Sequence, residues 1–115
     1  MGLFWKSESD RIIEEIQDIT ARVNIYLRQI EQSLIANDGA SSNNINDLVN
    51  WSQSIAPFMV KANNLYEGLC DKGKRNTDVP WVDGRYFHYS LYVMSVISAL
   101  NKVEYAIKHY HGTDF

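Results

Sequence analysis

Several polar side chains of this chain belong to the residue types that metal, acid–base or nucleophilic chemistry requires. Glu14 and Asp18 are four residues apart, so both carboxylates lie on one side of a helix, close enough to share a metal ion. Inward-facing carboxylate sites of helical bundles also use a Glu-x-x-His motif on neighbouring helices, and this sequence contains no such motif. Both residues fall on the polar side of the predicted helix, and we interpret them as a solvated pair.

A second set of candidate metal ligands, His109, His111 and Asp114, lies near the C-terminus. Side chains two positions apart on a helix point in different directions, so these two imidazole rings would not face one ion. Positive charge in the last turn of a helix interacts favourably with the helix dipole, which accounts for both histidines without a metal. We expect no metal site and no cofactor in this protein.

The single cysteine, Cys70, follows Leu69 near the end of a predicted helix. A cysteine acts as a nucleophile when a base or a positive charge stabilises its thiolate, and no histidine is close to Cys70 in the sequence. We interpret it as a small buried or half-buried residue. One cysteine also excludes a disulfide within the chain.

Arg85 and His88 are the remaining candidates for catalysis, at the predicted start of the third helix and close to Asp83. Together they are the basis for one alternative function, a small helical-bundle enzyme with a polar site at this helix start. As an isolated pair, the two side chains are more simply explained as surface polar groups, so our main prediction is a protein without catalytic activity.

Five aromatic residues surround the same helix start: Trp81, Tyr86, Phe87, Tyr89 and Tyr92. Tyr89 belongs to the apolar side of the helix and is predicted to be in the core. Trp81 and Tyr86 have no place in that pattern, and with Arg85 they have the composition of an interaction hot spot. The alternative is that Trp81 covers the open end of the helical core.

Three predicted helices position these residues, each marked by apolar side chains at alternating spacings of three and four. This spacing is typical of helices that pack lengthwise against one another, as in coiled coils. The first helix is predicted from about Ser7 to Ala36, the second from Asn43 or Asn44 to Cys70, and the third from Asp83 to about His111. The three apolar ladders are Ile12, Ile16, Ile19, Val23, Tyr26 and Ile30; Leu48, Trp51, Ile55, Phe58, Ala62, Leu65 and Leu69; and Tyr89, Val93, Val96, Leu100, Val103, Ile107 and Tyr110.

The ends of these helices carry recognisable signals. Ser7 with Asp10 three residues later resembles a capping box, and Gly39 is suited to the left-handed conformation that follows many helices. Asp83 is the predicted N-cap of the third helix, with Val82 and Phe87 spaced to form a hydrophobic staple. Helices of similar length joined by shorter loops predict an all-α fold, an antiparallel up-down-up three-helix bundle without a sheet.

Pro57 lies inside the second predicted helix, where proline removes one backbone hydrogen bond. The apolar ladder nevertheless passes from Ile55 to Phe58 without losing phase, and Pro57 projects away from it. We therefore predict one helix, kinked at Pro57, with the freed carbonyl of Gln53 facing solvent. Two separate helices meeting at Ala56 are the alternative.

The third helix carries a second apolar ladder, nearly opposite the first: Phe87, Leu91, Met94, Ser98, Asn101 and Tyr105. A helix that is apolar on two sides needs neighbours on two sides. We predict that a second copy of the chain covers this ladder in a homodimer, or else another protein. The alternative is cover within the chain by Phe4, Trp5 or Trp81. The predicted partner-binding residues are Phe87, Leu91, Met94, Tyr105, Trp81, Arg85 and Tyr86.

The length, composition and net charge of the chain limit the classes of function that it can have. The chain has 115 residues, of which 45% are hydrophobic, and a formal net charge of −3, so we expect a single helical domain over residues 1–115. Nucleic-acid binders carry a basic face, whereas the small basic cluster here, Lys72, Lys74 and Arg75, is flanked by Asp71 and Asp78. We expect no nucleic-acid partner.

Leu3, Phe4 and Trp5 form a short apolar tip that is the basis of a second alternative, a peripheral membrane protein. Three inserted residues bind a bilayer weakly, and the longest uncharged run falls short of a membrane span, so we expect packing on the protein and a cytoplasmic location. Our main prediction is a non-catalytic protein-interaction module: an adaptor, a small inhibitor or an immunity-type protein that self-associates through its third helix.

Overall fold

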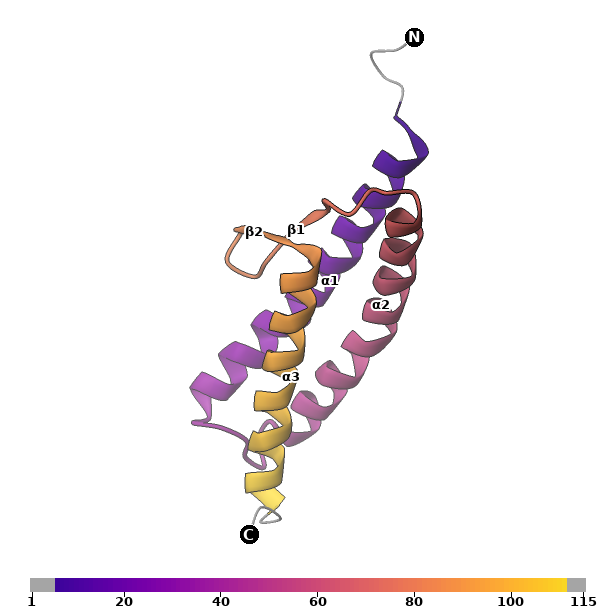
Figure 1. The fold of residues 1–115 in the computed structure, drawn as a ribbon. Coiled ribbons are helices and arrows are strands. Elements are labelled where there is room, and N and C mark those ends of the chain that lie inside the picture. Colours follow the sequence, from indigo (N-terminus) through magenta and orange to yellow (C-terminus); the bar gives the residue numbers. More distant parts are fainter. Residues whose placement is uncertain (1–5, 112–115) are drawn as a thin grey trace.

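The computed structural model describes residues 6–111. These residues form three helices, α1 (Glu8–Ala36), α2 (Ile45–Asp71) and α3 (Tyr89–His111), with two short strands, β1 (Asp78–Pro80) and β2 (Tyr86–His88), between α2 and α3. The molecule is elongated, measuring 59 × 24 × 20 Å, and α1 and α2 lie side by side for most of its length (Figure 1). The prediction of a mostly helical chain is confirmed, but the prediction that it contains no sheet is wrong.

The ends of α1 follow the local signals in the sequence. The Ser7 hydroxyl accepts a hydrogen bond from the Asp10 backbone N–H at 3.1 Å, as an N-cap does. After α1, Asp38 and Gly39 both have positive φ angles, 52° and 109°, and the Gly39 N–H returns to the Leu34 carbonyl. The buried Asn44 amide then fixes the following loop by accepting from the Ser41 N–H at 2.7 Å. Both predicted boundaries of α1 are confirmed within one residue.

The core lies mainly between α1 and α2. Ile16 and Val23 from α1, and Leu48, Ile55 and Leu69 from α2, are fully buried. Because these residues recur every seven positions or in alternating threes and fours, they form continuous apolar stripes that run the length of both helices. The first two predicted ladders therefore correspond to the real interface.

Helix α2 passes through Pro57 as a single helix. Pro57 and Gln53 are both exposed, so the carbonyl that proline leaves without an intrahelical donor is on the side where water can reach it. The prediction of one helix across Pro57 is confirmed, and the alternative of two helices meeting at Ala56 is wrong.

Pro57→Ala is expected to leave the free energy of unfolding unchanged or to raise it by ~1–3 kcal/mol, because alanine restores the missing N–H donor at an exposed helix position. Urea denaturation of both proteins measures the difference, with Gln53→Ala as the control for removing a neighbouring exposed side chain. A marked loss of stability in Pro57→Ala alone would mean that the proline is needed to shape α2.

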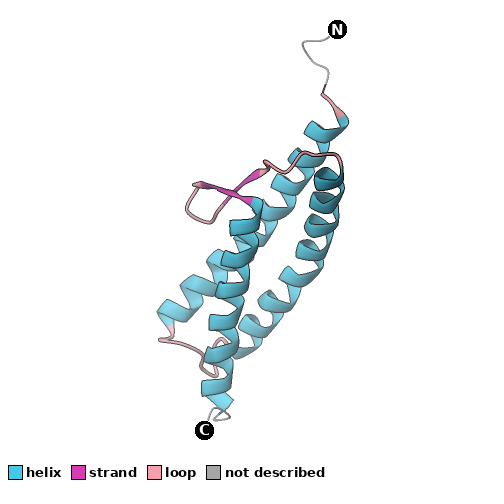
Figure 2. Cartoon of the chain, in the orientation of Figure 1, coloured by secondary structure: helices cyan, strands magenta, loops and turns pink. Residues whose placement is uncertain are grey.

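The segment before α3 differs from the sequence-based prediction. Residues 83–88 do not begin a helix, and Val82 and Phe87 form no hydrophobic staple. Instead β1 and β2 pair in antiparallel fashion, with Val79 opposite Phe87, and the five residues from Trp81 to Arg85 close a tight hairpin turn (Figure 2). The Trp81 N–H donates to the Arg85 carbonyl at 2.7 Å, and Gly84 adopts a φ of 88° that favours glycine. Helix α3 begins only at Tyr89.

The outer edge of β1 is held by side chains of α1. A strand edge carries carbonyl groups that need donors, and three alternate carbonyls receive one each, two of them in β1 and the third just after it. The Gln17 amide donates to Asp78 at 3.0 Å, the Asn24 amide to Pro80 at 2.7 Å and the Arg28 guanidinium to Val82 at 3.2 Å. The hairpin is thus fixed beside the middle of α1 by contacts that span more than fifty residues of sequence.

Candidate functional site

The outer side of α3 exposes large apolar side chains. Leu91 is 48% exposed, Met94 67% and Tyr105 62%. With Ser98 and Asn101, which are also exposed, they follow a spacing of three and four and so share one side of the helix. We call these five residues, Leu91, Met94, Ser98, Asn101 and Tyr105, the outer strip. Ile97, 52% exposed, lies next to it.

Phe87 does not belong to the outer strip, although it was predicted there. It lies in β2, is half-buried, and stacks on Trp81 with ring centroids 5.5 Å apart. Trp81 also meets the ring of the buried Tyr92 edge-on at 5.5 Å. These contacts attach the hairpin to α3 through aromatic packing.

A groove of about 610 Å³ lies between α1 and α3, next to the outer strip. Leu27, Leu34 and Ile35 line its α1 wall, and Met94, Ser98 and Ala99 line its α3 wall. Trp81 and Val82 of the hairpin also line it. The lining also includes two charged residues of opposite sign, Glu31 from α1 and Lys102 from α3.

The α1 wall of this groove was not predicted from the sequence. Leu27 and Leu34 flank the predicted ladder of α1, and with Ile30 they form a second run at spacings of three and four. That pattern marks an apolar stripe wide enough to contact more than one neighbour. The spacing could therefore have indicated that α1 has a second apolar contact surface.

Arg85 and His88 are not brought together. The Arg85 guanidinium pairs with the Asp83 carboxylate at 2.6 Å and lies over the Phe87 ring, 5.2 Å from its centroid. Hydrogen bonds from Arg85 hold the pKa of the Asp83 carboxyl below its usual value. The His88 ring lies 2.9 Å from the Arg75 carbonyl and accepts from the Ser90 N–H. Arg85 lies in the turn and His88, three residues later, at the end of β2; successive side chains along an extended segment point to opposite sides, so an odd separation places the two candidate groups on different sides.

Two tyrosines, Tyr89 and Tyr92, carry the polar contacts near the start of α3. The Tyr92 hydroxyl donates to the Thr20 carbonyl at 3.0 Å and to Asn24 Oδ1 at 2.8 Å, while the Tyr89 hydroxyl donates to Asn63. Burial raises the pKa of the Tyr89 and Tyr92 phenols above the usual value. Both phenols therefore stay neutral at physiological pH and act as structural hydrogen-bond donors.

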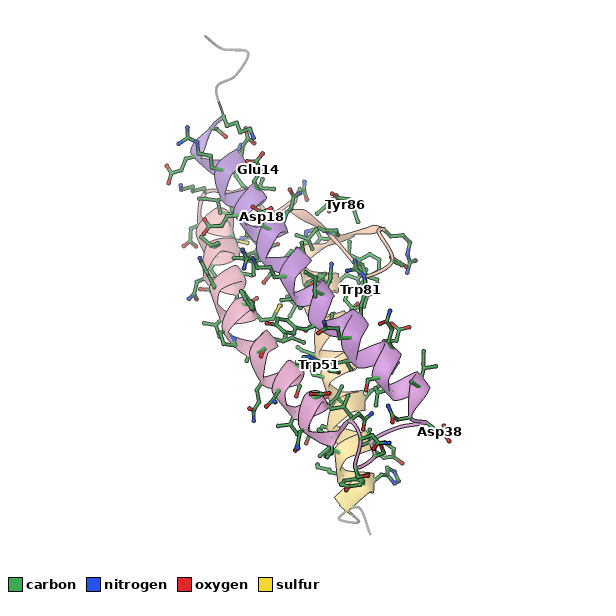
Figure 3. All side chains as sticks on the ribbon, turned by 180° about the vertical axis from the view of Figure 1, so that it is seen from behind. Glu14, Asp18, Asp38, Trp51, Trp81 and Tyr86 are labelled. Atoms are coloured by element: carbon green, nitrogen blue, oxygen red, sulfur yellow. The ribbon has the colours of Figure 1, made fainter. Side chains whose placement is uncertain are left out.

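The other sequence candidates lie apart from the groove. Glu14 and Asp18 are exposed on successive turns of α1 (Figure 3), and Glu14 pairs with Lys6. No group of three or more potential metal ligands occurs among residues 6–111. Cys70 is half-buried with a free thiol, and Tyr86 of the hairpin is 63% exposed.

The apolar tip Leu3, Phe4 and Trp5 and the candidate ligand Asp114 lie outside the described residues. Within residues 6–111, no helix has both the length and the apolar character that a membrane-spanning segment requires.

Comparison with known proteins finds no matching family model, no matching curated protein and no matching solved structure.

Proposed function

We propose that this protein is a non-catalytic protein-interaction module, an adaptor, small inhibitor or immunity-type protein, that self-associates through the outer strip of α3. In this proposal the chain is an antiparallel up-down-up three-helix bundle, with α2 kinked at Pro57, and a second copy completes it. The observation that carries the proposal is the exposure of Leu91, Met94 and Tyr105 on one side of α3, at 48%, 67% and 62%.

An exposed apolar strip of this kind favours a protein partner. Residues 91 to 105 of a helix span about 21 Å, and contiguous apolar surface on a protein usually marks an interaction site. Two copies of α3 related by a two-fold axis would each present the same strip, so the surface is suited to pairing with itself. Ser98 and Asn101, in the middle, are placed to form hydrogen bonds between the copies and to set the register.

The geometry of the polar candidates gives no comparable support to an enzyme. The alternative of a site at the start of α3 requires Arg85 and His88 to act on the same molecule, yet each is committed to different partners within the hairpin and its neighbouring loop. We therefore keep the interaction module as the proposed function, and propose that it acts in the cytoplasm as the sequence predicts.

Sedimentation velocity tests the proposal. The wild-type protein is expected to sediment as a dimer in the micromolar range, and Leu91→Glu as a folded monomer, because a carboxylate buried in the interface has no partner there. The expected loss of affinity is at least about a hundredfold. Val60→Glu is the matched control, since Val60 is 60% exposed on α2, away from the outer strip, and this variant should remain a dimer.

Two results together would contradict the proposed self-association. A wild-type monomer at high micromolar concentration, together with loss of helical circular dichroism in Leu91→Glu, would mean that the outer strip is covered within the chain. The self-association proposed here would then be wrong.

A further inference from the structure

The groove between α1 and α3 arises because the two helices separate along their length. They meet near the start of α3, where the buried Tyr92 hydroxyl bonds to Thr20 and Asn24 of α1. Further along both helices, from Leu27 to Ile35 and from Met94 to Lys102, they line the two walls of the groove instead. Both helices run in the same direction as they separate (Figure 1). A wedge-shaped space between two helices is suited to a third helix.

The groove has an apolar lining with small residues on one wall. The α3 wall carries three short side chains, from Ser95, Ser98 and Ala99. Short side chains allow another helix to approach closely. Ile35 and Met94 at the groove are 74% and 67% exposed. Large apolar side chains exposed at the groove favour an occupant with apolar side chains of its own, and the small residues let its backbone approach closely.

The charges of the groove are complementary to each other but are not paired. Glu31 lies on the α1 wall and Lys102 on the α3 wall, and neither forms an ion pair with another residue between 6 and 111. An occupant that matches this groove therefore carries a cation to face Glu31. Among residues 6–111, α3 carries such a cation, Lys102, beside its own exposed apolar strip.

We propose that the groove of each copy receives α3 of a second copy. This rests on the proposed function and adds that the interface includes α1, so each α3 packs between α1 and α3 of its partner. A two-fold axis near Ser98 places residues equally distant from Ser98 opposite each other. Met94 of one copy then lies opposite Lys102 of the other copy. Ile35 lines the groove at this same end. Leu91 lies opposite Tyr105, and the small residues around Ser98 meet in the middle.

The same arrangement pairs the charges between copies. Lys102 of one copy then lies opposite Met94 of the other copy. That position is about one helical turn from Glu31 of the same second copy, a distance that a lysine side chain can span. Because the two-fold axis repeats each contact, two Glu31–Lys102 pairs form, one at each end. A parallel arrangement of the two α3 helices would instead place the two Lys102 side chains next to each other, which is unfavourable.

Cross-linking between differently labelled copies tests this geometry. In a Cys70→Ser background, one protein carries Ile35→Cys and the other Met94→Cys. A short thiol-specific cross-linker is expected to give a covalent dimer after the two proteins are mixed and allowed to exchange subunits, and little from either protein alone. Ile25→Cys replaces Ile35→Cys as the matched control, because Ile25 is 51% exposed on α1 and does not line the groove.

The outcomes separate this inference from the proposed function. Cross-linking of Ser98→Cys to itself without a product from mixed Ile35→Cys and Met94→Cys would mean that the α3 helices pair outside the groove. That result overturns the inference and leaves self-association standing. Equal yields from Ile25→Cys and Ile35→Cys would also overturn it, since the contact would not be specific to the groove. A monomeric wild-type protein would overturn both.

Discussion

Asn24→Asp is expected to lower the free energy of unfolding by at least ~3 kcal/mol at pH 7. Asn24 is 2% exposed. Its amide donates to the Pro80 carbonyl at 2.7 Å, and its Oδ1 accepts from the Tyr92 hydroxyl at 2.8 Å. An aspartate keeps the acceptor but replaces the donor with an oxygen, so a buried negative charge would face a carbonyl. The substitution disrupts the point where α1, the hairpin and α3 meet.

The pH dependence of this variant gives the sharper measurement. Burial and the neighbouring carbonyl should raise the pKa of the introduced carboxyl in the folded state above the ~3.9 of an unfolded chain. Below the unfolded-state pKa the carboxyl is protonated in both states, and its O–H can donate to Pro80, so the stability deficit relative to wild type is smallest. The deficit then grows as pH rises through the folded-state pKa and levels off above it.

Chemical denaturation of wild type and Asn24→Asp between pH 3 and pH 8 measures this difference directly. Asn64→Asp serves as control, because Asn64 is exposed on α2 and its substitution should cost no more than about 0.5 kcal/mol at any pH. A pH-independent difference for Asn24→Asp would contradict the buried donor contact with Pro80.

The hairpin that Asn24 holds is also the part of the fold that the sequence analysis did not predict. Asp83 and Gly84 are a frequent hairpin turn pair, but Asp83 also fits a helix N-cap, and the spacing of Val82 and Phe87 also fits a staple. Strands of three residues are too short to give a recognisable alternation of polar and apolar positions. The hydrogen bonds from Gln17, Asn24 and Arg28 hold the hairpin from far away in the sequence, so local patterns do not contain them.

The helices were predictable because their signals are local. Ser7 and Gly39 mark the ends of α1, and the ladder of α2 keeps its phase across Pro57, so neighbouring residues suffice to predict both. The exposed part of α3 was also predicted, since Leu91, Met94 and Tyr105 share one side of any helix that contains them. The groove was not, because its shape depends on the angle at which α1 and α3 separate.

Ile55→Ala is expected to lower the free energy of unfolding by ~2–5 kcal/mol, because it leaves a cavity at a fully buried position in the core between α1 and α2. Leu100→Ala should cost less, since Leu100 of α3 is only half-buried and the protein around it can relax toward solvent. Ile25→Ala is the control at a 51% exposed site and should cost less than about 1 kcal/mol.

Urea denaturation of all three variants at one protein concentration gives this order, because the stability of a self-associating protein depends on concentration. The expected order would mean that contacts between α1 and α2 contribute most of the free energy of folding, and that the contacts of α3 with them contribute less. That distribution suits an interaction helix, since α3 can then present its outer strip to a partner while α1 and α2 maintain the fold. Equal losses at Ile55 and Ile25 would contradict it, because the buried interface between α1 and α2 would no longer be the main source of stability.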